Sequence, residues 1–422
     1  MRAENRRIGF VWNRGAIGSL RAEELRFPMF SKRTHWTLLP NRLSRILEGR
    51  RGQPVIDLTE SNPTRCGLVY ETQRILNALG NEGALCYRPD PRGPQEGREA
   101  IANYYRERGV SLDAGQIFIT SSTSEAYSYV FRLLGDPGDS ILVPQPSYPL
   151  FEFLSQLDDI STSVYPLVYS HGWQMDRFAL QERIRPDCRA ILLVNPNNPT
   201  GSYVSPDDHT FLINLCHEQE LALVADEVFF DYRLETPLDC APQSLAGETA
   251  ALTFTLSGLS KICALPQMKL AWIVVNGPGK LMETALARLE VIADTYLSVS
   301  TPLGLALPTL LETRNSIQPQ IQERTRGNLA RLDTMLSAPS SVSRLKTEGG
   351  WCAILRVPAL CTDEEWAIAL LQQDSVLVHP GHFYDFPSDG HLVVSLLTAP
   401  DRFEEGVLRL LARIESHQPF WR

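Results

Sequence analysis

The sequence contains no pair of cysteines in a CxxC spacing. Its eight cysteines are scattered along 422 residues, which is typical of reduced thiols in a cytosol rather than of a zinc site or a disulfide framework. We therefore expect no structural metal and a cytoplasmic location.

Long apolar runs and an excess of positive charge are also absent. No apolar stretch reaches the ~18 residues that a membrane-spanning helix needs. The formal net charge of −9 argues against a nucleic-acid surface, because binding phosphates requires a basic face. We expect neither a membrane nor a nucleic acid among the partners of this chain.

The length of the chain and its 43% hydrophobic content predict a sizeable core divided between two domains. The first 28 residues carry six arginines together with Glu4, Glu23 and Glu24, and they lack the apolar core of a signal peptide. The expected organisation is a loosely ordered tail (1–28), an N-terminal segment packing on the small domain (29–60), a large α/β domain (61–300), a long interdomain helix (301–340) and a small α+β domain (341–422).

Short apolar runs alternate with helical patterns through the first two thirds of the chain. The runs are Ile117–Thr120, Ile141–Val143, Ala190–Val194, Leu221–Ala225, Ala251–Leu256 and Leu270–Val275. Continuous apolarity predicts strands that are covered on both faces, and strand–helix alternation predicts a mostly parallel sheet. Helices are expected at Pro94–Arg108, at Pro206–Glu218, at Lys280–Leu297 and, interrupted by Pro308 and Pro319, at Leu303–Leu336.

The residues that follow these runs carry the chemistry, since ligands of such sheets bind at the carboxyl ends of the strands. They are the hydroxyl-rich SSTSEAY, then Tyr148 in PQPSY, Asn198 in NPNNPTG, Asp226 in DEVFFDY and Lys261 in SGLSK. Together they offer an anion site at a helix start, a flat aromatic face, an amide, a carboxylate and a lysine. Pyridoxal 5′-phosphate uses all five groups, because its aldehyde bonds a lysine, its ring nitrogen pairs with a carboxylate and its phosphate needs an anion site.

With these motifs the sequence resembles the class I/II aminotransferases of the fold type I pyridoxal-phosphate superfamily. The resemblance runs from about Val55 to the C-terminus and includes Tyr87 and Gly93 in YRPDPRG and the HPG at His379–Gly381. It implies a large domain with a mostly parallel seven-stranded sheet, a smaller α+β domain and a transfer of amino groups between an amino acid, or a related amine, and a 2-oxo acid.

The resemblance also implies a role for each matching residue. Lys261 would hold the cofactor as a Schiff base and shuttle the substrate's proton, while Asp226 would keep the pyridine nitrogen protonated. Tyr148 would stack on the ring and Asn198 would bond its 3′-oxygen. The phosphate would be held by Ser122, Thr123, Ser124, Ser260 and Lys269, and Tyr87 would reach the site of the neighbouring subunit in a homodimer.

Three positions depart from the family pattern. Lys269 stands where the family has a phosphate-binding arginine, which loses the bidentate fork, and Phe229 stands where a tyrosine often donates to the 3′-oxygen. Val393 replaces the arginine that clamps the substrate's carboxylate, and a valine cannot bind a carboxylate. The candidates to take over that contact are Ser61 and Arg65 in the SNPTRCG loop, Arg92 and His391, with Arg65 favoured.

Three classes of function remain open on the sequence alone. The first is an aminotransferase. The second is another pyridoxal-phosphate enzyme of biosynthesis, such as a lyase, decarboxylase or cyclase. The third is a cofactor-binding module without catalysis, which is disfavoured because about 50 N-terminal residues are too few for a winged-helix domain and its linker.

Overall fold

The computed structural model describes residues 29–36, 39–234, 242–297 and 299–416. The predicted tail 1–28 and Cys240 lie outside this part, and the other seven cysteines are free thiols. Within the described ranges, no helix combines the length and apolarity that crossing a bilayer requires.

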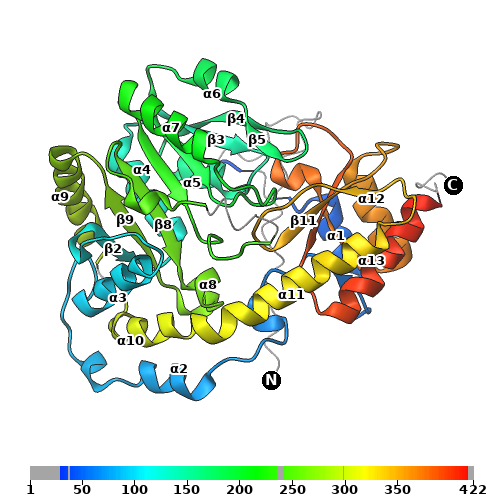
Figure 1. The fold of residues 1–422 in the computed structure, drawn as a ribbon, viewed down its shortest axis with the longest axis horizontal. Helices are drawn as coiled ribbons and strands as arrows, with labels where there is room; N and C mark the ends of the chain where they lie inside the picture. The colour runs from blue at the N-terminus through cyan, green and yellow to red at the C-terminus, as the bar shows by residue number, and fades with distance from the viewer. Residues whose placement is uncertain (1–28, 37–38, 235–241, 298, 417–422) are drawn as a thin grey trace.

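An eight-stranded sheet forms the centre of the larger part of the molecule (Figure 1). Its order is β2 (Ile117–Thr120), β9 (Ala271–Asn276), β8 (Thr253–Gly258), β7 (Ala222–Asp226), β6 (Cys188–Val194), β3 (Ser140–Gln145), β4 (Ser161–Tyr169) and β5 (Trp173–Met175). Strand β9 runs antiparallel to both neighbours and β5 antiparallel to β4, while the other pairs are parallel. The mostly parallel sheet is therefore confirmed, and β5 adds a short edge strand to the seven expected.

Alternate residues of the central strands pack on opposite faces of the sheet. In β6, Leu192 and Val194 join a cluster with helices α4 (Thr123–Leu134), α5 (Leu150–Leu157) and α9 (Gly279–Tyr296). Ile191 and Leu193 join the opposite cluster, with α6 (Arg177–Arg183) and α7 (Pro206–Glu218). Farther along that face lie α3 (Gln95–Arg106) and α10 (Thr301–Glu312), with α2 (Thr72–Leu79) beside α10. Because both faces are covered, the central strands β7 and β8 are buried along their whole length.

The long helical pattern near residue 310 forms two helices that meet at Thr313. Helix α10 ends at Glu312 and α11 (Arg314–Met335) begins directly after, so the expected interruptions at Pro308 and Pro319 were wrong: both prolines lie inside helices. The Thr313 hydroxyl donates a hydrogen bond of 2.7 Å to the Leu310 carbonyl and so satisfies an acceptor at the junction. Helix α11 then spans from the large sheet to the smaller part of the molecule (Figure 1).

The smaller part contains a four-stranded antiparallel sheet in the order β10 (Ser343–Arg344), β11 (Cys352–Arg356), β14 (His391–Ser395) and β13 (His379–Pro380). Helices α12 (Asp363–Ala369) and α13 (Pro400–Glu415) pack with it around one apolar core.

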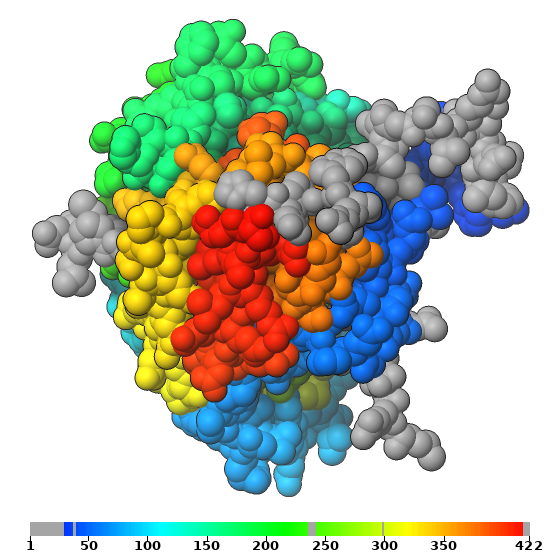
Figure 2. Space-filling view, turned by 90° about the vertical axis from the view of Figure 1, so that its right-hand side faces the viewer, coloured from blue at the N-terminus to red at the C-terminus, as the bar shows by residue number. Residues whose placement is uncertain are grey.

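The N-terminal segment joins this core rather than that of the large sheet. After α1 (Arg42–Gly49), strand β1 (Ile56–Asp57) pairs in parallel with β12 (Val376–Leu377). Leu58 is fully buried in the same cluster as Phe403 and Val407 of α13. Figure 2 shows this contact from outside, with the blue N-terminal segment lying against the orange and red C-terminal elements.

Gly406 in α13 makes this contact possible, and replacing it should weaken the fold. A Cβ at Gly406 would lie 2.8 Å from Ile56 Cγ2 and 2.9 Å from Leu58 Cδ2. We expect Gly406→Ala to lower the free energy of unfolding by about 1–2 kcal/mol, because overpacking outweighs the preference of alanine for helices. Urea denaturation measures the change.

Gly327→Ala in α11 provides the matched control. The nearest atom to a Cβ there is the flexible end of Arg331, at 3.1 Å, so this substitution should raise the free energy of unfolding by up to ~1 kcal/mol. Equal stability of Gly406→Ala and the parent would contradict the packing argument.

Candidate active site

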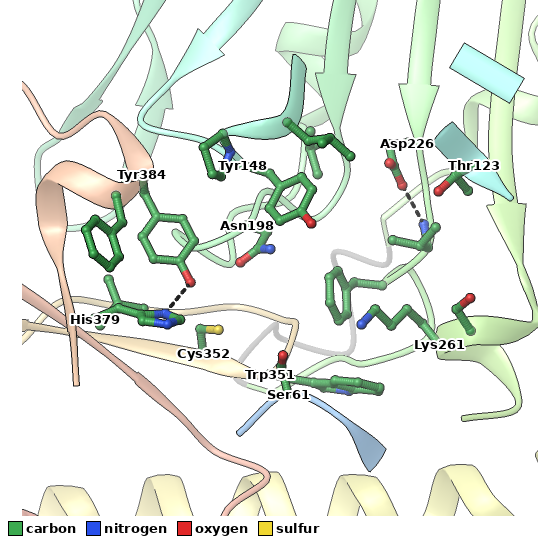
Figure 3. Close-up of a pocket in the computed structure, with 18 of the residues that line it drawn as sticks. Ser61, Thr123, Tyr148, Asn198, Asp226, Lys261, Trp351, Cys352, His379 and Tyr384 are labelled. Carbon is green, nitrogen blue, oxygen red and sulfur yellow. Dashed lines mark hydrogen bonds between the residues drawn. The ribbon is translucent and has the colours of Figure 1, made fainter. Parts of the chain in front are cut away.

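A cavity of about 420 Å³ opens where the strands of the large sheet end and the smaller part begins (Figure 3). Its lining includes every predicted cofactor residue except Tyr87. These residues are Ser122, Thr123, Ser124, Tyr148, Asn198, Asp226, Ser260, Lys261 and Lys269. They come from distant parts of the sequence, and the parallel strands bring them to one edge of the sheet.

Lys261 projects into this cavity between two aromatic rings. It lies in the short helix α8 (Leu259–Ile262), directly after β8, and the Tyr232 hydroxyl fixes its carbonyl at 2.5 Å. Its Nζ is 5.2 Å from the centroid of the Phe229 ring and 4.9 Å from that of Trp351. No carboxylate of the described residues forms an ion pair with it, and burial lowers the pKa of its ammonium group. The lysine is therefore available as a nucleophile and a base.

Asp226 is the last residue of β7 and presents a fixed carboxylate to the cavity. The Tyr127 hydroxyl donates to Oδ2 at 2.7 Å, and the Val228 N–H donates to Oδ1 at 3.1 Å. Burial raises the pKa of this carboxyl, and the two hydrogen bonds and the nearby charge of Lys261 oppose that rise. The sequence analysis did not predict this role of Tyr127. The feature that could have indicated it is the position of Tyr127 in the SSTSEAY motif, one helical turn after Thr123.

The start of α4 offers backbone donors to the same cavity. Ser122 is the N-cap, and its Oγ accepts a hydrogen bond from the Glu125 N–H at 3.1 Å. The N–H groups of Thr123 and Ser124 belong to the first turn, where N–H groups have no acceptor within the helix. Together with the hydroxyl groups of these residues, they form a site suited to an anion.

Two loops hold Tyr148 and Asn198 side by side. Asn197 joins them, because its Nδ2 donates to the Pro146 carbonyl at 2.9 Å and its Oδ1 accepts from the Ser147 hydroxyl at 3.0 Å. Asn197 was also not predicted. It is the buried neighbour of Asn198, which is half-buried and lines the cavity, and its hydrogen bonds reach a loop that is far away in the sequence.

Lys269 lies at the rim of the cavity with an exposed side chain. It ends the short helical turn Pro266–Met268, and its backbone has a φ of 51°, in the left-handed region that non-glycine residues seldom adopt. This turn leads the chain into β9 and leaves the lysine facing the same opening as Ser260.

Most of the expected substrate contacts lie outside the cavity lining. Ser61 lines it, but Arg65 does not: its side chain is 57% exposed and lies 3.3 Å from Glu60. Arg92 binds Glu290 at 2.6 Å. His391 stacks on Phe386, with ring centroids 4.5 Å apart. Of the candidates for carboxylate binding, the structure therefore places only Ser61 at the site.

The wall opposite Lys261 is formed by the smaller part of the molecule. Figure 3 shows His379, Tyr384 and Cys352 across the cavity from Lys261 and Asp226, with Asn198 between the two groups. His379 Nδ1 lies 3.0 Å from the Tyr384 hydroxyl, and Val393 lines the same wall. Sequence reasoning missed this pair, since His379 was noted only as part of the HPG motif.

Comparison with known proteins agrees with this arrangement. The family model for aminotransferase class I and II matches residues 54–404. The chain belongs to this family. The prediction of an aminotransferase is thereby confirmed, and of the three classes of function the first is the one that this family represents.

Relatives of this aminotransferase span most of its length. It is 24% identical over 379 residues to the glutamate-pyruvate aminotransferase AlaA of Haemophilus influenzae, covering 87% of this chain and 92% of the relative. It is 26% identical over 349 residues to the tyrosine aminotransferase of Dictyostelium discoideum, covering 78% and 81%. An aminotransferase structure from Escherichia coli matches with a TM-score of 0.79 and 26% identity, covering 90% of this chain and 94% of that one.

Proposed function

We propose that this aminotransferase binds pyridoxal 5′-phosphate in the cavity through Lys261 and transfers an amino group between an amino acid and a 2-oxo acid. The observation that carries the proposal is Lys261 itself. Lys261 forms no ion pair with a carboxylate of the described residues, lies between Phe229 and Trp351 and faces the same cavity as the buried Asp226. A lysine in such a place is costly unless it serves a ligand.

The residues present fit this cofactor. The amine of Lys261 suits an aldehyde, and the carboxylate of Asp226 suits a protonated ring nitrogen, which would offset the burial that raises its pKa. The free N–H groups and hydroxyl groups at the start of α4, with Lys269 at the rim, suit a phosphate. Tyr148 and Asn198 lie where a flat ring would need a stacking face and an amide donor.

When bound, pyridoxal phosphate supplies an electrophilic aldehyde and a ring that accepts electrons. Lys261 Nζ then removes the proton from the substrate's Cα and later returns one, and its lowered pKa favours the neutral base. The charge of Asp226 would favour a proton on the ring nitrogen of the bound cofactor. Phe229 and Trp351 flank Lys261 Nζ and limit the access of water to it.

The choice of substrates follows from the relatives, whose names include glutamate, pyruvate, alanine and tyrosine. We propose α-amino acids of this range as donors and their 2-oxo acids as acceptors. The holoenzyme mixed with a donor alone should release one equivalent of 2-oxo acid per site, and adding an acceptor should start multiple turnovers. Release of carbon dioxide or of an elimination product instead would contradict amino transfer and favour a lyase or decarboxylase.

A homodimer is part of the same proposal. Tyr87 is 75% exposed and Leu85 is 93% exposed in the single chain, so this apolar loop is free to contact a second copy. In that dimer Tyr87 would reach the phosphate of the neighbouring cavity. Light scattering at the concentration used for assays measures the mass, and a monomer with full activity would contradict the arrangement.

Lys269→Ala should weaken retention of the cofactor without abolishing its covalent attachment. We expect the dissociation constant to rise about ten- to a hundredfold, since a hydrogen bond to a charged group contributes ~1.5–3 kcal/mol. Lys269→Arg should bind at least as tightly as the parent, because a guanidinium binds phosphate with two parallel bonds. Absorbance titration of the apoprotein measures both constants.

Lys280→Ala is the control, because Lys280 is an exposed lysine in the first turn of α9, outside the cavity lining. A Lys269→Ala protein that retains cofactor as tightly as Lys280→Ala would remove Lys269 from the phosphate site.

A further inference from the structure

The register of the small sheet identifies the residues that lie directly beside Val393 on the two neighbouring strands. Across β14 it stands opposite Ile354 of β11 on one side and His379 of β13 on the other. Directly opposed residues of antiparallel strands lie on the same face, with Cβ atoms about 4.5–5.5 Å apart. His379 is therefore the polar side chain beside the position where the sequence places valine instead of a carboxylate-binding arginine.

His379 and Tyr384 form a hydrogen-bonded pair in the cavity wall. The distance from Nδ1 to the hydroxyl oxygen is 3.0 Å, and both residues line the cavity. Nε2 of His379 has no hydrogen-bond partner among the described residues. A neutral histidine and a tyrosine carry two protons on these groups, of which their mutual bond uses one.

The second proton is therefore available to a ligand in either tautomer. If the Tyr384 hydroxyl donates to Nδ1, the Nε2–H is the remaining donor. If Nδ1–H donates instead, the Tyr384 hydroxyl is the remaining donor. The pair thus keeps one donor that no protein acceptor in the described part of the chain consumes.

The surroundings of His379 hold it neutral. Burial lowers the pKa of its imidazole to about 4, against the opposing charge of Asp57 from β1. Cys352 of β11, Tyr148 and Tyr384 also face this region, and burial raises the pKa of the Cys352 thiol to about 12, so it is uncharged at neutral pH. No arginine of the described residues lines the cavity.

We propose that the His379–Tyr384 pair replaces the missing arginine and binds the carboxylate of the amino acid and of the 2-oxo acid through a single neutral donor. The inference rests on the proposed function and identifies the residues that recognise the substrate's carboxylate in the same site. Besides the donor of the pair, Asn198, which lies between this pair and Asp226, has two amide protons, of which one is assigned to the ring and the other is open to the carboxylate (Figure 3). Recognition of the substrate then depends on hydrogen bonds and not on a cation.

A neutral donor discriminates poorly between a carboxylate and a primary amide, because both offer a carbonyl-type oxygen as an acceptor. A guanidinium prefers the carboxylate through charge and two parallel bonds. We therefore expect 3-phenylpropanoate and 3-phenylpropanamide to bind the holoenzyme with dissociation constants within about fivefold of each other. These probes suit the cavity, whose wall contains the aromatic rings of Phe151, Phe153 and Phe383. Calorimetry measures both constants without turnover.

Variants of the pair test the assignment. His379→Leu should raise both constants, and KM for the amino donor, about three- to tenfold with little change in kcat, the effect of losing one hydrogen bond from an uncharged donor. His379→Gln, whose amide can replace the Nε2–H, should recover most of this loss. Tyr384→Phe should raise the constants by a similar factor. His217→Gln, on the exposed end of α7, should match the parent.

Val393→Arg should reverse the selectivity, with the acid preferred over the amide by at least about tenfold. The measurement on the parent protein needs no variant, so the inference stays testable even if this arginine is not accommodated. A parent that prefers the acid by a hundredfold would overturn the proposal. So would a His379→Leu protein that binds both probes as the parent does, or a larger effect of His391→Gln than of His379→Leu.

Borohydride fixation separates this inference from the proposed function. If reduction attaches the cofactor to Lys261 in the parent and the probes fail the predictions above, the inference alone falls. If no adduct forms on Lys261 in the parent, the proposed function falls and the inference falls with it.

Discussion

Lys261→Ala is expected to abolish both amino transfer and covalent attachment of pyridoxal phosphate. Nζ of Lys261 is the amine that faces the cavity from between Phe229 and Trp351, and burial lowers its pKa. The substitution removes the nucleophile and the proton carrier together, and loss of general acid–base catalysis alone costs about 10²–10⁴ in rate. Borohydride reduction followed by peptide mass mapping should find the cofactor on Lys261 in the parent and on no lysine in the variant.

Lys269→Ala is the matched control for that experiment. It removes the other lysine of the cavity lining, yet it should still yield the reduced adduct on Lys261 when cofactor is in excess. An adduct on Lys269 in the parent protein would overturn the assignment of Lys261. Appreciable turnover by Lys261→Ala would show that another group moves the proton.

Asp226→Ala should retain cofactor but lose activity by at least about a thousandfold, equivalent to ~4 kcal/mol of barrier. Asp226 is the buried carboxylate that two donors orient toward the cavity. Asp226→Ala would remove the charge that favours a protonated ring nitrogen, and an unprotonated ring would accept electrons poorly. Steady-state kcat, measured after cofactor content is matched by absorbance, gives the size of the loss.

Tyr127→Phe separates the effect of the Asp226 charge on activity from the effect of the orientation of its carboxylate. It removes only the 2.7 Å hydrogen bond to Oδ2, so kcat should fall by about ten- to a hundredfold, and less than in Asp226→Ala. An Asp226→Ala protein within tenfold of the parent would show that Asp226 is not the partner of the ring nitrogen.

The sequence predicted the strands of the large sheet best, because each strand is marked by a pattern of neighbouring residues. Continuous apolar runs predicted six strands of the large sheet, because residues such as Leu192 and Leu193 must each be buried on a different face. The residues that follow those strands then had to meet at one edge. That geometric rule predicts that Asp226 and Lys261 lie close together, and both line the cavity.

The residues that contact the substrate could not be predicted from the sequence in the same way. His379 lies beside Val393 only through the register of β13 on β14, which no pattern in either short strand specifies. Arg65 looked suitable by its place in the chain, but its loop turns it toward Glu60 and solvent. No apolar run marks β5, at the edge of the sheet, or its neighbour β4, because neither strand is buried along its whole length.

The pairing of β1 with β12 determines when the molecule can finish folding. Leu58 is synthesised well before Leu377, whose carbonyl accepts the Leu58 N–H at 3.0 Å, and well before Phe403. The apolar side chains of the first segment can therefore be buried in this core only after α13 has been made. Ser61, only three residues beyond Leu58, lines the cavity, so this wall of the candidate site is complete only after β1 has paired with β12.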